Sequence, residues 1–207
     1  MENTFRTFRK KYRCQSKEQA FKVLDDIFGT IADLPYWIAK VTAIQNSVFD
    51  SRFIPHKLLP DAVHYNGQVF LKLINASMFL MDFPPISKEE LNWKHLIDDL
   101  IESRYLNQEK PDAFYHLLAY YPRHLSQGQI LNPSRFIRKF FKRKSLESWI
   151  RRWNHFRETA FYKFSITEGN EGSYFKDFQY FLKLTEASYL IYVRHSPTQN
   201  PNSYASI

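Results

Sequence analysis

Glycine is scarce in this sequence, and its absence excludes several kinds of functional site. Five glycines occur in 207 residues, although tight hairpins and phosphate-binding loops depend on this residue. The sequence contains no Gly-x-Gly-x-x-Gly, no Walker-type Gly-Lys-Ser/Thr and no Gly-x-Ser-x-Gly pattern. Nucleotide binding through a glycine-rich loop and the nucleophile elbow of α/β hydrolases are therefore excluded.

Cysteine is limited to one residue, Cys14. A single cysteine forms no internal disulfide and no cysteine-based zinc site, which fits a reducing compartment and predicts a cytoplasmic protein. The basic neighbours Arg13 and Lys17 favour a thiolate, but the segment offers no rigid base to orient it, so we expect no catalytic role for Cys14.

Long hydrophobic runs are also missing. The most apolar stretch, Val69 to Phe83, contains Lys72, Asn75 and Asp82 and is shorter than the roughly 20 apolar residues that cross a bilayer. The N-terminal residues are basic with no apolar segment behind them, which is unlike a secretory signal. We therefore expect a soluble protein with no membrane partner.

Acidic residues are outnumbered by basic ones. The sequence has 29 lysines and arginines against 21 aspartates and glutamates, for a formal net charge of +8. An excess of positive charge attracts nucleic acid and other anionic partners through counterion release and electrostatic steering. Net charge alone carries no specificity, and a basic surface that only keeps the protein in solution remains the alternative.

Apolar residues, by contrast, are plentiful enough for a large core. They make up 44% of the sequence, and aromatic residues alone supply 17%. A chain of this length favours one domain. We predict a basic N-terminal arm at residues 1–15, a single helical domain at 16–195 and a disordered tail at 196–207, where proline, asparagine and serine dominate.

Helical periodicity and capping residues recur along the chain, whereas alternating β-branched runs do not. The sequence therefore predicts an all-α bundle or array of about seven or eight helices. The expected helices cover 16 to about 29, 33 to 49, 62 to 82, 87 to 106, 111 to 121, 133 to 142, 145 to 164 and 173 to 195. Residues 126–129 are expected to form a loop.

Metal and cofactor sites have little support. Asp61 and His64 are spaced like one half of a helical di-metal site, but no second such pair accompanies them. Asp112 and His116 also share a helical face, which is more typical of a solvated pair. We expect no metal, no cofactor and no enzymatic activity, and keep a metal-independent helical hydrolase as a minor alternative.

The segment at residues 132–157 carries the strongest functional signal. It holds nine lysines and arginines and one acid, Glu147. Its apolar residues fall on one side of each of two expected helices, which anchors both helices to the core and leaves the cations on the solvent side. The residues that we expect to contact nucleic acid are Arg135, Arg138, Lys139, Lys142, Arg143, Lys144, Arg151, Arg152 and His155.

Two short helices joined by a Lys-Arg-Lys turn suggest a helix-turn-helix arrangement. In such an arrangement the turn contacts phosphate groups and the second helix lies in the major groove of DNA. The sequence thus favours a nucleic-acid-associated, DNA-binding regulatory or accessory protein. A membrane-surface role for the same helices is less favoured, because the core needs their apolar faces. The main alternative is a protein-interaction module that uses exposed aromatic residues, either Tyr115, Tyr120 and Tyr121 or the region of Trp37.

Overall fold

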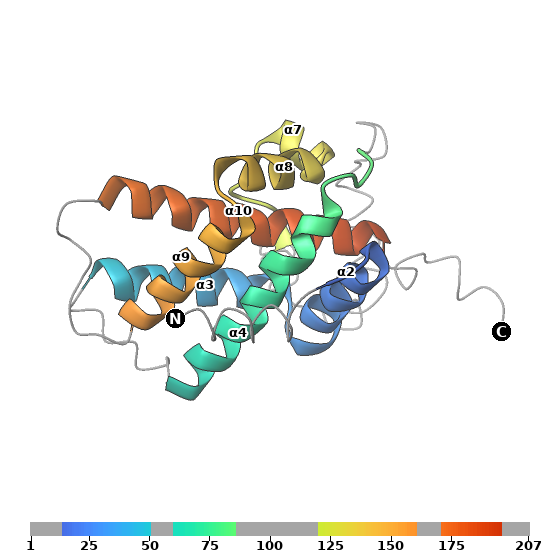
Figure 1. Cartoon of the computed structure of the whole chain (residues 1–207). Helices are drawn as coiled ribbons and strands as arrows, with labels where there is room; N and C mark the ends of the chain where they lie inside the picture. The colour runs from blue at the N-terminus through green and yellow to red at the C-terminus, as the bar shows by residue number, and fades with distance from the viewer. Residues whose placement is uncertain (1–13, 51–59, 86–119, 161–170, 196–207) are drawn as a thin grey trace, which may run out of the picture.

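The structure, a computed structural model, describes residues 14–50, 60–85, 120–160 and 171–195. Every element of secondary structure within these ranges is helical (Figure 1), so the prediction of an all-α fold is confirmed. The elements are α2 (Lys17–Leu24), the π-helix η1 (Asp25–Ile31), α3 (Leu34–Phe49), α4 (Pro60–Ser77), the 3-10 helix η2 (Met78–Leu80), α7 (Gln127–Leu131), α8 (Pro133–Arg143), α9 (Leu146–Thr159) and α10 (Glu171–His195).

Four helices begin where the sequence predicts, because a polar side chain caps each of them. A capping oxygen accepts a backbone N–H of the first turn that has no partner within the helix. The caps are Ser16 with the N–H of Gln19 (3.3 Å), Asp33 with that of Tyr36 (3.0 Å), Asn132 with that of Arg135 (3.1 Å) and Ser145 with that of Ser148 (3.2 Å).

Four predicted boundaries are wrong. The helix α4 begins at Pro60, two residues before the expected residue 62, and α9 ends at Thr159 and not near residue 164. Residues 126–129 belong to the start of α7 rather than to a loop, and the Ser126 N–H donates to Oε1 of Gln129 at 3.0 Å. This reciprocal Ser-x-x-Gln arrangement is typical of a helix N-terminus, and it outweighs the low helix propensity of Gly128. The helix α10 begins at Glu171, two residues before the expected Ser173.

The first predicted helix is divided into α2 and the π-helix η1, which ends beyond Gly29. Gly29 faces the phenol of Tyr192 on α10, and a Cβ atom added at residue 29 would lie 2.8 Å from that hydroxyl oxygen. A side chain at residue 29 would therefore require the phenol of Tyr192 to shift.

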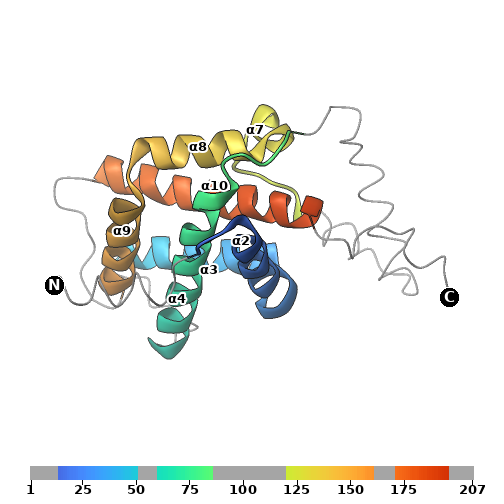
Figure 2. The ribbon, with the colours of Figure 1, turned by 45° about the vertical axis from the view of Figure 1, so that its right-hand side comes forward.

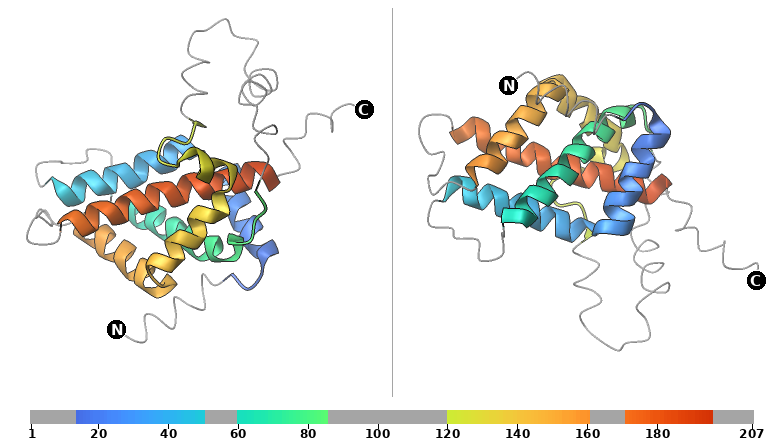
Figure 3. Two further views of the ribbon diagram at one scale, coloured as in Figure 1. Left: turned by 90° about the horizontal axis from the view of Figure 1, so that it is seen from above. Right: turned by 60° about the horizontal axis from the view of Figure 1, so that its bottom comes forward.

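The long helix α10 lies at the centre of the arrangement. It packs against α3 and α8, and both run antiparallel to it (Figures 1 and 2). The helices α4 and α9 lie beside each other and cross α3 and α10 at a steep angle, as Figure 1 and the right-hand view of Figure 3 show. The end of α8 therefore lies next to the first turns of α10.

Aromatic residues from four helices meet in the core around the ring of Phe181. Ring centroids of Phe70, Phe140, Trp149 and Trp153 lie 5.8, 6.0, 5.2 and 5.1 Å from it. The buried indole N–H groups are paired, since Trp149 donates to the carbonyl of Phe140 at 2.9 Å and Trp153 to that of Gly67 at 3.1 Å. The apolar faces of α8 and α9, the two helices of the basic segment 132–157, are thus anchored in the core, as expected.

Two expected environments are corrected. Cys14, assigned to a loosely attached arm, is 4% exposed and joins the core. Phe175, assigned to the apolar stripe of the last helix, is 49% exposed. The expected helices at 87–106 and 111–119, most of the predicted arm and the predicted tail lie outside the described residues.

None of the described helices combines the length and the apolar character that crossing a bilayer requires.

Candidate nucleic-acid interface

The helix α8 has one apolar face and one basic face. Its buried residues are Pro133, Ser134, Phe136, Ile137 and Phe140. Its charged residues are five cations with no acid among them, namely Arg135, Arg138, Lys139, Lys142 and Arg143. Burial of the first set against α10 holds the second set at the surface.

Four of these cations form the row that we call the α8 stripe: Arg135, Arg138, Lys139 and Lys142. All four residues are exposed, and their spacing of three and four residues places them on one side of the helix over about 10 Å. Arg138 also donates from one guanidinium nitrogen to the carbonyl of Met81, which fixes the position of its side chain.

The next cations along the chain turn inward to a buried acid. Asp177 on α10 is fully buried, and its carboxylate contacts Arg143 Nη2 at 3.4 Å, Arg152 Nε at 2.9 Å and the ammonium of Lys144. We call Asp177 and these three cations the Asp177 cluster. It joins the end of α8, the turn after it and the middle of α9 to α10.

Aromatic rings support each cation of the Asp177 cluster. The guanidinium of Arg143 lies 4.9 Å from the ring centroid of Tyr180, and that of Arg152 lies 4.3 Å from that of Tyr174. The ammonium of Lys144 lies 5.0 Å from the ring of Trp149. Cation–π contacts of this kind add to the ion pairs and restrict the side chains.

The Asp177 cluster contains three of the nine residues that the sequence predicts to contact nucleic acid. We expected Arg143 and Lys144 on the solvent side and Arg152 on the flank of its helix. Each of them has the internal partner Asp177, so replacing it disturbs packing as well as surface charge. The two remaining candidates on α9, Arg151 and His155, are exposed. Two residues of the Lys-Arg-Lys turn, Arg143 and Lys144, therefore hold α8 and α9 against α10.

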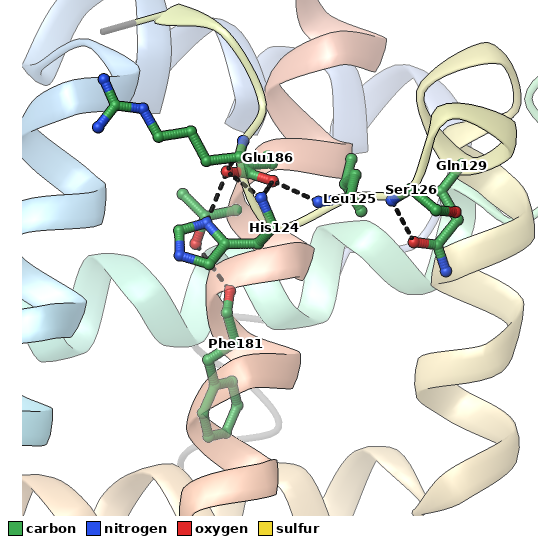
Figure 4. A network of polar contacts seen from close by, with 8 residues as sticks. His124, Leu125, Ser126, Gln129, Phe181 and Glu186 are labelled. Atoms are coloured by element: carbon green, nitrogen blue, oxygen red, sulfur yellow. Dashed lines mark hydrogen bonds and ion pairs between the residues drawn. The ribbon is translucent and has the colours of Figure 1, made fainter.

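A second buried acid, Glu186, organises the segment before α7 (Figure 4). Its carboxylate accepts the backbone N–H groups of Arg123 at 2.8 Å, His124 at 3.0 Å and Leu125 at 3.0 Å, and it contacts Nδ1 of His124 at 2.7 Å. Three consecutive N–H groups facing one carboxylate tie this segment to the middle of α10.

Sequence reasoning missed both acids, although a signal for them exists. Asp177 lies one turn from Phe181 on α10, and Glu186 lies one turn from Leu182 and Leu190. All five residues are buried. A carboxylate that falls within an apolar helical stripe requires hydrogen-bonding partners inside the fold. That position marks these residues as members of buried polar networks.

The alternative aromatic surface is only partly present. Trp37 is 1% exposed, and its indole N–H donates to the carbonyls of Ile27 and Ala32. Trp37 itself is therefore not part of an exposed surface, whereas its neighbour Tyr36 is 37% exposed. Tyr120 is partly buried and donates to Asp33 Oδ2 at 2.8 Å. Tyr121 is 44% exposed, and Tyr115 lies outside the described residues.

Metal-binding groups do not converge in the part of the chain that the structure describes. No group of three or more histidine, cysteine, aspartate or glutamate side chains is arranged to hold an ion there. His64 is exposed, and nothing is described for the side chain of Asp61 or for the pair Asp112 and His116.

Comparisons with protein-family models, with curated proteins and with solved structures found no match to this chain.

Proposed function

We propose that this protein binds nucleic acid through the α8 stripe, with Arg151 and His155 of α9 as further contacts, and that it serves as a DNA-binding regulatory or accessory protein without enzymatic activity. One observation carries the proposal. Five cations and no acid lie on α8, and its opposite face is buried in an aromatic core.

The positive charge of the α8 stripe favours a polyanionic partner such as duplex DNA. Duplex DNA carries one negative charge per about 1.7 Å of axis, so a stripe of about 10 Å faces roughly six of them. Each lysine or arginine that neutralises a phosphate releases a condensed counterion, which favours binding at low salt. Contacts of this type are to the backbone and position the protein without reading the sequence.

The proposed interface is narrower than the nine residues that the sequence predicted. Arg143, Lys144 and Arg152 are engaged with Asp177, so we assign the main contacts to the α8 stripe. This division also makes the proposal easier to test, because exposed cations are replaceable without removing a partner from a buried acid.

The test compares two triple variants with the same change in net charge. The first is Arg135→Gln, Lys139→Gln, Lys142→Gln on the α8 stripe. The control is Lys22→Gln, Lys72→Gln, Lys176→Gln, which replaces three exposed lysines on other helices. Fluorescence anisotropy with a labelled duplex at low salt measures the affinity.

We expect the stripe variant to bind roughly tenfold or more weakly than the parent, whereas the control keeps most of the affinity. Equal weakening in both variants would show that only total charge matters. If the parent binds no duplex at low salt, the protein-interaction module becomes the better account.

A further inference from the structure

We propose that the Asp177 cluster is a binding site for a phosphate group that carries two negative charges. The site would lie where Arg143, Lys144 and Arg152 meet, beside the start of α9. It uses different residues from the α8 stripe and does not depend on the proposed function.

The first argument is the charge of the cluster. Among the ion pairs of the described residues, these three cations share one carboxylate, that of Asp177. One negative charge against three positive charges leaves an excess of two. A phosphomonoester carries about −1.5 to −2 at neutral pH, so it matches this excess.

The second argument is that donors remain at the surface. Asp177 contacts one nitrogen of each arginine, Nη2 of Arg143 and Nε of Arg152, whereas a guanidinium has five N–H donors. The side chain of Asp177 is 0% exposed, but those of Arg143, Lys144 and Arg152 are 31%, 21% and 24% exposed. The carboxylate thus holds the cations from inside while part of each faces solvent.

The third argument is that the cations are held in place before a ligand arrives. Tyr174, Asp177 and Tyr180 follow one another at three-residue spacing on α10, so they lie on one side of the helix. The ring of Tyr174 contacts the guanidinium of Arg152, and the ring of Tyr180 contacts that of Arg143. The carboxylate of Asp177 lies between the two tyrosines in the sequence of α10. Arginine side chains fixed in this way lose little conformational entropy when they bind an anion.

The same chemistry has two sources, inorganic phosphate in solution and a terminal phosphate on a nucleic acid strand. An internal phosphodiester carries one negative charge rather than two and would neutralise the excess only in part. The cluster therefore favours a terminal group over the backbone.

The first experiment uses the parent protein and inorganic phosphate as the probe. A ligand that binds the folded state raises the melting temperature in a saturable way. We expect sodium phosphate at pH 7.5 to raise it above the value in sodium chloride of equal ionic strength. An equal melting temperature in the two salts at every concentration would overturn the proposal.

The second experiment locates the site with Arg152→Gln and, as a control, Lys176→Gln, which removes one exposed cation next to Asp177 in sequence. The measured quantity is the rise in melting temperature that phosphate produces in each variant, and not the melting temperature without phosphate. We expect Arg152→Gln to lose most of the increment and Lys176→Gln to retain it.

If Arg152→Gln does not fold, Arg143→Gln replaces it, since its contact with Asp177 is longer. A full increment in a folded variant of either arginine would overturn the assignment.

A third comparison separates the two sources and the two proposals. An oligonucleotide with a 5′-phosphate should compete with inorganic phosphate better than the same strand without it; if the two strands compete equally, the terminal group is not recognised and free phosphate is the ligand. The stripe variant Arg135→Gln, Lys139→Gln, Lys142→Gln should keep the full phosphate increment. Loss of the increment in that variant would contradict a separate site at Asp177.

Discussion

Cys14 shows how much the fold alters a single side chain. It is 4% exposed, and its backbone N–H donates to the buried Asn75 Oδ1 at 3.2 Å. Burial raises the pKa of the Cys14 thiol above its usual value, so less thiolate is present at neutral pH and reagents reach it poorly.

We therefore predict that Cys14 reacts slowly with an aromatic disulfide reagent in the folded protein at pH 8 and rapidly after denaturation. Absorbance of the released thiolate follows both reactions. A folded protein that reacts as fast as the denatured one would show that Cys14 is accessible.

Tyr189 supplies a prediction about alkaline pH. Burial, together with the nearby Tyr120, Tyr192 and Asp33, raises the pKa of Tyr189 well above its ordinary value. In the unfolded chain this phenol ionises near pH 10, whereas in the folded protein it keeps its proton. The free energy of unfolding should therefore fall as the pH rises above about 10.

Denaturant midpoints at pH 9 and pH 11 measure this effect. Other groups titrate in the same range, so the comparison is with Tyr189→Phe, which lacks the phenol. We expect the parent to lose more stability between the two pH values than Tyr189→Phe does. Equal losses would exclude a contribution from Tyr189.

At the scale of single residues, the sequence predicts which side chains are candidates for function but not which residues they contact. The candidates include every lysine and arginine of 132–157 except Arg157. Nothing in their spacing shows that Arg143, Lys144 and Arg152 meet Asp177. Arg143, Lys144 and Arg152 lie 34, 33 and 25 positions from Asp177. They meet it because α8 packs against α10 and rings of α9 contact rings in the first half of α10. Long-range contacts of this kind depend on helix packing, which local patterns do not fix.

At the scale of elements, local signals account for most of the helices. Capping residues and apolar periodicity predicted the starts of α2, α3, α8 and α9, since each depends on residues within one turn. The expected loop at 126–129 is wrong because Ser126 and Gln129 form a capping box, which favours a helix despite Gly128. The start of α10 at Glu171 is not predicted, because Gly172 is more typical of a loop than of a first helical turn.

Glu186 gives a prediction for the segment that leads into α7. Replacing it with glutamine keeps the side-chain size but removes the charge and turns a donor group toward backbone N–H donors. Charge-assisted hydrogen bonds are stronger than neutral ones, and a buried donor without a partner is costly. We expect Glu186→Gln to lower the free energy of unfolding by about 2–4 kcal/mol.

Glu158→Gln is the matched control, because Glu158 is an exposed acid on α9. Its replacement should change the free energy of unfolding by no more than about 0.5 kcal/mol. Urea denaturation of the parent and both variants measures the difference. A loss from Glu186→Gln as small as that from Glu158→Gln would mean that the segment does not depend on the carboxylate.

At the scale of the whole molecule, composition predicted the fold class and the large aromatic core. The arrangement around α10 was not predictable in the same way, because any of several helices has an apolar stripe able to occupy the centre. Its consequence for function is the separation of two groups of cations. The α8 stripe faces solvent, while Arg143, Lys144 and Arg152 gather around a carboxylate from the central helix.

The most direct test of the central claim is the salt dependence of duplex binding by the parent and by Arg135→Gln, Lys139→Gln, Lys142→Gln. Each phosphate contact contributes about 0.9 to the slope of log affinity against log salt concentration. We expect the slope of the stripe variant to be smaller by about 2.7 in magnitude, for three lost contacts. The control variant Lys22→Gln, Lys72→Gln, Lys176→Gln should keep the parent's slope. Equal slopes and affinities for parent and stripe variant, or no binding by the parent at low salt, would contradict the central claim.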